Sequence, residues 1–165
     1  WTEWLVTDGA GFEAVHPDLP PTAMLSVLGT TGLTAWCGLF KLGKPQPGET
    51  VLVSGAAGAT GSTVGQLAKV AGCRAIGIAG GAEKCRWLVE EAGYDAAIDY
   101  KAGNVRAQLK ELAPGGVDVI FDNVGGRLLN DMLGHIATGA RIVICGGISR
   151  YETGTMPAGP ENYFN

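Results

Sequence analysis

The chain has 165 residues, of which 46% are hydrophobic and 17% are charged, so it is long and apolar enough for one domain with a substantial core. Its net charge is -4 and its pI is near 5.1, and no cluster of Lys and Arg offsets this locally, which argues against nucleic acid as a partner. Because no apolar run approaches the roughly 20 residues of a membrane helix and no signal-peptide pattern opens the chain, we expect a cytoplasmic protein with no membrane partner.

The first residues predict an origin inside a longer protein. Residues 1–7 read as the end of a strand, and a turn-rich stretch follows as far as Pro20 and Pro21. We therefore expect residues 1–21 to be a remnant of a preceding domain and its linker. Residues 22–150 are expected to form one α/β domain, and residues 151–165 a loop that leads toward a further part of the protein.

From Thr22 onward, short apolar runs alternate with longer amphipathic segments, as is typical of strands joined by crossover helices. The predicted strands are residues 51–54, 74–79, 96–100, 117–123 and 141–146. Right-handed crossovers of these lengths predict a doubly wound parallel sheet of the Rossmann type, ordered 3-2-1-4-5. The sixth strand of a complete dinucleotide-binding fold is missing from this pattern.

Helical spacing of apolar residues predicts the intervening helices. The first of these helices precedes the first strand and is expected to end near Gly43. Its apolar face is expected to pack on the sheet. The predicted faces are Leu33, Trp36, Cys37 and Phe40; Val64, Leu67, Ala68 and Ala71; Trp87 and Leu88; Val105, Leu109 and Leu112; and Leu129, Met132, Leu133 and Ile136.

Cysteine and histidine residues give no sign of a metal site. Cys37, Cys73, Cys85 and Cys145 are irregularly spaced, and we expect buried free thiols in preference to disulfides or metal ligands. Two histidines, His16 in a Pro-rich connector and His135 in the last predicted helix, form no cluster with them.

A glycine loop joins the first predicted strand to the next helix. In Ser54-Gly55-Ala56-Ala57-Gly58-Ala59-Thr60-Gly61 the spacing is G-x-x-G-x-x-G and all side chains are small. Such a loop lets the backbone approach a diphosphate, and the free N–H groups near Ala59 and Thr60 donate to its oxygens, while Gly61 permits close helix packing. A tight turn without a ligand is the alternative. Since no Gly-Lys-Ser/Thr follows, the loop is not that of a nucleoside triphosphatase.

Cofactor preference is expected to depend on the end of the second strand, where NAD-binding proteins carry an acidic residue. Here the sequence is Ile78-Ala79-Gly80-Gly81, without a carboxylate. Lys84 follows near a helix N-terminus, where a cation is unfavourable unless an anion lies close. This favours the 2'-phosphate of NADP(H) as that anion, with Tyr100 beside it. A solvated Lys84 and simple edge packing of Tyr100 are the alternatives.

Two further segments follow predicted strands and so belong at the carboxyl edge of the sheet, where ligands bind in open α/β folds. Asn123 is expected to hydrogen-bond the nicotinamide ribose. The segment Cys145-Gly146-Gly147-Ile148-Ser149 is small enough to leave room for a nicotinamide ring. A loop that merely needs glycine dihedrals explains Gly147 equally well.

Taken in order, these segments resemble the cofactor domain of the medium-chain dehydrogenase/reductases. The branch that they are most similar to is the zinc-independent one of prostaglandin/leukotriene reductases and alkenal double-bond reductases. The resemblance rests on residues 32–35, 56–61, 83–84, 99–101, 122–126 and 145–149. It covers nearly the whole chain but neither a barrel-like, GroES-like N-terminal domain nor the last strand.

The resemblance implies NADP(H) bound through Gly58–Gly61, with Lys84 and Tyr100 at the 2'-phosphate. Asn123 and the segment from Cys145 to Tyr151 would lie near the ribose and nicotinamide. In this family, hydride goes from NADPH to the β-carbon of an enone or enal, so that only the C=C bond is reduced. A conjugated carbonyl compound is thus the implied substrate, without a metal, and a homodimer through this domain is expected.

Catalytic groups are scarce in this chain. The developing enolate needs a hydrogen-bond donor, and Tyr163 is a weak candidate, with packing in a loop as its alternative. Other reactions stay open: quinone reduction, zinc-dependent alcohol oxidation, or an NADP(H)-binding module without turnover. We expect the chain alone to be inactive.

Overall fold

The computed structural model describes residues 4, 6–11, 14–151 and 159. In chain order the elements are α1 (Pro21–Met24), α2 (Thr30–Trp36), the π-helix η1 (Cys37–Gly43), β1 (Thr50–Ser54), α3 (Ala59–Val70), β2 (Arg74–Ala79), α4 (Ala82–Glu90), β3 (Ala96–Asp99), α5 (Val105–Leu112), β4 (Val117–Asp122), α6 (Gly126–Leu133), β5 (Ile136–Ile144) and the 3-10 helix η2 (Ile148–Arg150).

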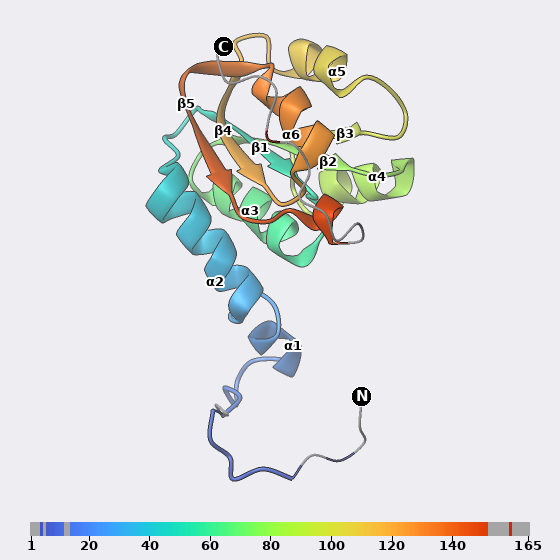
Figure 1. The fold of residues 1–165 in the computed structure, drawn as a ribbon. Coiled ribbons are helices and arrows are strands. Elements are labelled where there is room, and N and C mark those ends of the chain that lie inside the picture. The colour runs from blue at the N-terminus through green and yellow to red at the C-terminus, as the bar shows by residue number, and fades with distance from the viewer. Residues whose placement is uncertain (1–3, 5, 12–13, 152–158, 160–165) are drawn as a thin grey trace.

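The strands form one parallel sheet in the order β3-β2-β1-β4-β5, as the sequence predicts (Figure 1). Helices cover both faces. Val51 and Val53 of β1 face a core shared with α2, η1, α3 and α4, whereas Leu52 between them faces a core shared with α5 and α6. This alternation along short apolar strands is expected for a parallel sheet buried on both sides. Among the described residues, β5 is an edge strand.

The helix before β1 buries a different face from the predicted one. Leu33 and Trp36 are 62% and 43% exposed, while Ala35 and Leu39 are fully buried. The second half of the helix is π-helical and ends with Lys44 N–H donating to Leu39 O, but Leu33 and Trp36 precede it in the α-helical turns of α2. Ala35 and Leu39, four residues apart, fit a helical stripe as well as the predicted residues do, so the period alone does not fix the buried face and the prediction is wrong for Leu33 and Trp36.

The boundary between α6 and β5 also differs from the prediction. Ile136 belongs to β5 and pairs with Val117, so its place in the predicted helical stripe is wrong. The preceding helix, α6, ends at Leu133 with Gly134 as its C-cap, and His135 lies outside it, with a ring nitrogen 2.7 Å from Ala113 O. Leu129, Met132 and Leu133 are buried on the inner face of α6. Ile136 has helical spacing from them only by coincidence, because the chain has already left α6 and entered β5 there.

The start of the chain forms no strand in the part that the structure describes. Trp4, Val6 and Thr7 lie outside any strand, which contradicts that prediction for these residues, and residues 1–3 and 5 are outside the described ones. The segment 14–20 and α1 extend away from the sheet (Figure 1). The predicted division of the chain into three parts stays a prediction.

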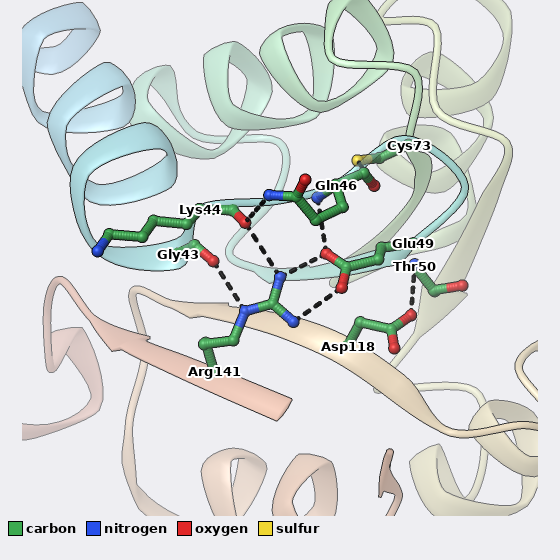
Figure 2. A network of polar contacts seen from close by, with 8 residues as sticks. All are labelled: Gly43, Lys44, Gln46, Glu49, Thr50, Cys73, Asp118 and Arg141. Atoms are coloured by element: carbon green, nitrogen blue, oxygen red, sulfur yellow. Dashed lines mark hydrogen bonds and ion pairs between the residues drawn. The ribbon is translucent and has the colours of Figure 1, made fainter. Parts of the chain in front are cut away.

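At the amino-terminal edge of the sheet, Arg141 of β5 ties three segments together (Figure 2). Its guanidinium donates to both carboxylate oxygens of Glu49, to Gly43 O at 3.0 Å and to Lys44 O at 3.2 Å. This pairing lowers the pKa of Glu49. The cluster closes the end of η1 onto the sheet and leaves the opposite, carboxyl edge for the loops of the candidate site.

Candidate functional site

The glycine loop predicted from sequence runs directly from β1 into α3. Gly55 has a φ of +59°, which favours glycine, and Gly58 N–H donates to Gly55 O at 3.0 Å. A β-carbon on Gly61 would lie 2.4 Å from Gly55 O and 2.8 Å from Ala56 Cα. The tight loop and the close approach of α3 to it therefore both depend on missing side chains.

The first turn of α3 offers hydrogen-bond donors at this edge. An α-helix leaves its first N–H groups without intrahelical acceptors, and the N-cap Gly58 brings no side chain to cap them. Gly58 and Ala59 are exposed, Thr60 is half-buried, and Gly61 is buried against the loop. An anion thus has access to the donors at the helix start, where the helix dipole also favours negative charge.

The loop after β4 lies beside the glycine loop and is organised by a buried carboxylate. Asp122 and Ser54 are both fully buried, and Ser54 Oγ donates to Asp122 Oδ1 at 2.6 Å. The same carboxylate accepts the N–H groups of Val124 at 3.1 Å and Gly125 at 2.9 Å. Ser54 and Asp122 belong to the site although sequence reasoning gave neither a role. The only sign of them in the sequence is that Ser54 and Asp122 each stand at the carboxyl end of a predicted apolar strand.

Asn123 follows β4 at the carboxyl edge of the sheet and bonds the end of β1. Its backbone N–H donates to Ser54 Oγ at 2.9 Å, and its side-chain Nδ2 donates to Ser54 O at 2.7 Å. Since the amide nitrogen is committed to a carbonyl, the side-chain oxygen faces away from that carbonyl and is available as an acceptor.

The segment after β5 is held against this loop by backbone hydrogen bonds. Cys145 and Gly146 N–H donate to Asp122 O at 2.8 and 3.0 Å, and Ile148 N–H donates to Asn123 O at 3.2 Å. Ser149 donates twice to Val124 O, from its N–H at 3.2 Å and from Oγ at 2.7 Å. The structure therefore brings Cys145–Ser149 together with Asn123 and the glycine loop, as predicted. Gly147 lies in the same segment and is half-buried.

The turn between β2 and α4 carries the remaining predicted residues. Lys84 is exposed in the first turn of α4, whose N-cap Gly81 provides no capping side chain. Tyr100 lies against the turn, because a β-carbon on Gly80 would come within 2.8 Å of its ring. Asp99, at the end of β3, accepts the N–H of Gly81 at 2.9 Å, a contact that lowers its pKa. A carboxylate thus supports the turn from the neighbouring strand.

A cleft of about 1120 Å³ opens beside these loops. Its lining combines Tyr100 with the loop after β4 and with residues that sequence reasoning did not single out, among them Asn104, Arg106 and Arg127. Arg106 is paired with Asp131 across the cleft wall at 2.9 Å. These residues follow helical patterns in α5 and α6, so nothing in the sequence alone marks them as lining one space.

The remaining predicted residues are two tyrosines near the end of the chain and the four cysteines. Tyr151 is 74% exposed at the end of η2, and Tyr163 is outside the described residues. All four cysteines are free thiols. Burial is confirmed for Cys73 only, since Cys37 and Cys85 are half-buried, and the prediction of burial is wrong for the exposed Cys145.

The described part of the chain contains neither a cluster of metal-ligating side chains nor a membrane-spanning helix. There, no three His, Cys, Asp or Glu side chains gather closely enough to hold a metal ion. No helix in that part has the length and apolar character to cross a membrane. The expected cytoplasmic location stays a prediction.

Comparison with known proteins identifies the family. The profile of the zinc-binding dehydrogenase family matches residues 59–161. The chain is 40% identical over 163 residues to the NADPH-dependent curcumin reductase of Escherichia coli, covering 98% of this chain and 47% of that protein. It is 44% identical over 166 residues to prostaglandin reductase 1 of Rattus norvegicus, covering 97% and 50%.

Among solved structures, CurA from Vibrio vulnificus in complex with NADPH has a TM-score of 0.80 at 45% identity, over 86% of this chain and 42% of that one. The chain spans about half the length of the relatives that it matches. It belongs to the zinc-binding dehydrogenase family of the medium-chain dehydrogenase/reductases, in the branch of the prostaglandin and curcumin reductases that its sequence resembles.

Proposed function

We propose that this chain is the NADP(H)-binding half of an oxidoreductase that reduces the C=C bond of α,β-unsaturated ketones or aldehydes. One observation carries the proposal. The uncapped first turn of α3 opens at the same sheet edge as the loops after β4 and β5, and the exposed Gly58 and Ala59 leave that turn open to a diphosphate.

In this proposal, each loop would bind one part of the coenzyme. The N–H groups from Gly58 to Gly61 would donate to the diphosphate. Asn123 would offer its side-chain oxygen to the nicotinamide ribose, and the segment from Cys145 to Tyr151 would border the nicotinamide ring. The cleft beside Tyr100 has room for the adenosine half.

Selection of the phosphorylated coenzyme would depend on Lys84 and Tyr100. Both border the β2–α4 turn, which carries no carboxylate of its own at the end of β2. Asp99, at the end of β3, accepts the N–H groups of Gly81 and Lys101 at 2.9 Å each, both at Oδ1. The lack of a carboxylate at the end of β2, where NAD-binding proteins carry one for the ribose hydroxyls, supports NADP(H) over NAD(H).

When bound, NADPH would supply a hydride to the β-carbon of the substrate. The residues of this chain bind and orient the coenzyme, and the enolate that follows needs a hydrogen-bond donor near the carbonyl oxygen. Tyr163 remains a weak candidate for that donor. The substrate class is supported by the curcumin and prostaglandin reductases at 40% and 44% identity, since curcumin carries C=C bonds conjugated to carbonyl groups.

Among the described residues, the outer edge of β5 pairs with no other strand, and such an edge suits a contact with a second copy. Ile142 and Ile144 are 40% and 61% exposed on it, and an unpaired parallel strand exposes backbone groups that pair readily. We accordingly place a homodimer contact here. A concentration-independent monomer in light scattering would contradict it.

Titration of this chain with NADPH and NADH tests the coenzyme assignment. We expect NADPH to bind and NADH to bind more weakly. The longer protein is then incubated with NADPH and, separately, with an enone, a quinone and an alcohol with NADP. Consumption of NADPH only with the enone supports the proposed reaction. Turnover with the quinone or the alcohol would assign the alternative reactions, and binding without any turnover a coenzyme-binding module.

A further inference from the structure

Ser54 and Asp122 are the two polar residues that the described part of the chain buries fully, and they lie in contact with each other. Burial of a carboxylate in a small domain is unfavourable unless hydrogen bonds compensate it. Here the donors are one hydroxyl and the backbone N–H groups of Val124 and Gly125. All of them come from the ends of β1 and β4, at the carboxyl edge.

The pair determines how Asn123 is held. Ser54 Oγ has one proton, which it gives to Asp122 at 2.6 Å, so that its lone pairs face the N–H of Asn123 at 2.9 Å. The carboxylate thereby orients the hydroxyl, and the hydroxyl anchors the backbone of Asn123. With the backbone anchored, Nδ2 reaches Ser54 O at 2.7 Å.

This chain of contacts allows only one orientation of the Asn123 carboxamide. The reverse orientation would set the side-chain oxygen against Ser54 O, where two acceptors repel each other. The oxygen therefore points away from β1, and among the described residues it accepts no hydrogen bond. A preorganised acceptor of this kind binds a hydroxyl donor with less loss of side-chain entropy than a freely rotating one.

We propose that Ser54 and Asp122 are positioning residues, which hold the Asn123 side-chain oxygen where it accepts a hydrogen bond from the nicotinamide ribose. This rests on the proposed coenzyme site and adds to it which residues set the nicotinamide half. The adenosine half would bind at the β2–α4 turn beside Lys84 and Tyr100, on strands other than those that carry the pair.

The two halves are separated by comparing NADPH with 2',5'-ADP, which has the 2'-phosphate but no nicotinamide ribose. Calorimetric titration of both ligands is carried out on wild type, Ser54→Ala, Asn123→Ala and the double variant. Ser26→Ala is the matched control, because Ser26 Oγ bonds Thr22 O at a distance from the loops. We expect Ser54→Ala to weaken NADPH about 5- to 10-fold, the effect of one lost hydrogen bond, and 2',5'-ADP less than about 2-fold.

In the double variant, Ser54→Ala should add nothing to the loss caused by Asn123→Ala, because a positioning residue has no effect without the group it positions. Additive losses, equal weakening of both ligands, or unchanged NADPH affinity would each overturn the proposal. If wild type binds neither ligand, the proposed coenzyme site itself is wrong and the inference is overturned with it.

Asn123→Asp gives an independent test that leaves the buried pair intact. The substituted side chain keeps an acceptor oxygen but loses the donor to Ser54 O. We expect NADPH affinity, relative to 2',5'-ADP, to fall as far as in Asn123→Ala. Retained relative affinity would show that orientation by Ser54 is unnecessary and would overturn the proposal even if Ser54→Ala does not fold.

Discussion

Replacement of Gly61 by alanine tests the tight contact between α3 and the glycine loop. The added methyl group would lie 2.4 Å from Gly55 O and 2.8 Å from Ala56 Cα, and both are backbone atoms that no side-chain rotation moves away. Relief requires α3 to shift from β1. Overpacking of this kind costs about 1 to 3 kcal/mol, and the gain in helix propensity from Gly to Ala returns about 1 kcal/mol.

The upper part of the overpacking range applies because backbone atoms form the contact. We therefore expect the free energy of unfolding to fall by about 2 kcal/mol in total. For a domain of this size the melting temperature then falls by about 4 to 8 °C. NADPH affinity should fall as well, because the shift moves the first turn of α3 away from the loop.

Gly58→Ala is the matched control three residues earlier. Its β-carbon would meet a single atom, Gly55 O at 3.3 Å, which a shift of a few tenths of an ångström relieves, and alanine is a poorer N-cap than glycine. We therefore expect a loss of about 1 kcal/mol and a fall of about 2 to 4 °C in melting temperature, less than for Gly61→Ala. Gly58 is exposed where the diphosphate would approach, so NADPH affinity should still drop. Melting followed by circular dichroism and calorimetric titration measure both effects. If Gly61→Ala melts at or above the Gly58→Ala temperature, the packing argument is wrong.

Three further predictions concern residues around this loop and at the opposite edge. Lys84→Ala should weaken NADPH by about 1.5 to 3 kcal/mol and NADH much less in paired titrations, whereas equal losses would remove Lys84 from the 2'-phosphate. Tyr94→Phe deletes a buried hydroxyl, whose pKa burial raises and which donates to Gly61 O at 2.7 Å; the melting temperature should fall by about 2 to 4 °C, and no change would contradict the bond. Arg141 lowers the pKa of Glu49, so this pair stabilises the fold above the ordinary carboxyl pKa of 4.5 and loses that contribution as the pH falls through the lowered value. Arg141→Met should therefore lower stability at pH 7 and flatten its fall between pH 5 and pH 3 in urea denaturation series, and parallel pH profiles would refute this.

Local patterns were enough to predict the strands and their order. Each strand is a short apolar run, and right-handed crossovers leave few arrangements for five such runs. The glycine loop was equally readable, because the need for glycine at Gly55 and Gly61 arises from backbone geometry within eight residues. The sequence also predicted which side chains lie at one edge of the sheet, because carboxyl ends of parallel strands share that edge. Lys84, Tyr100 and Asn123 each come within a few residues of the end of a predicted strand.

The helix before β1 and the start of β5 show where local patterns mislead. A 3.6-residue period assigned Leu33 and Trp36 to the core, but Ala35 and Leu39, on another face of the same helix, are the residues that reach it. Ile136 continues the period of α6 by chance. In both places packing against the sheet selects the conformation, and a window of one helix does not contain that information.

Sequence alone, then, determined the parallel sheet, its strand order and the loop that would receive a diphosphate. Each strand and the loop depend on neighbours within about ten residues, and right-handed crossovers then restrict the order of the strands. Only the tertiary structure decided the partners of the buried and half-buried polar groups. Ser54 and Asp122 meet across 68 residues and Arg141 meets Glu49 across 92. Such pairs form because folding removes water from both groups at once, and a polar group without water must find whichever donor or acceptor the fold brings beside it.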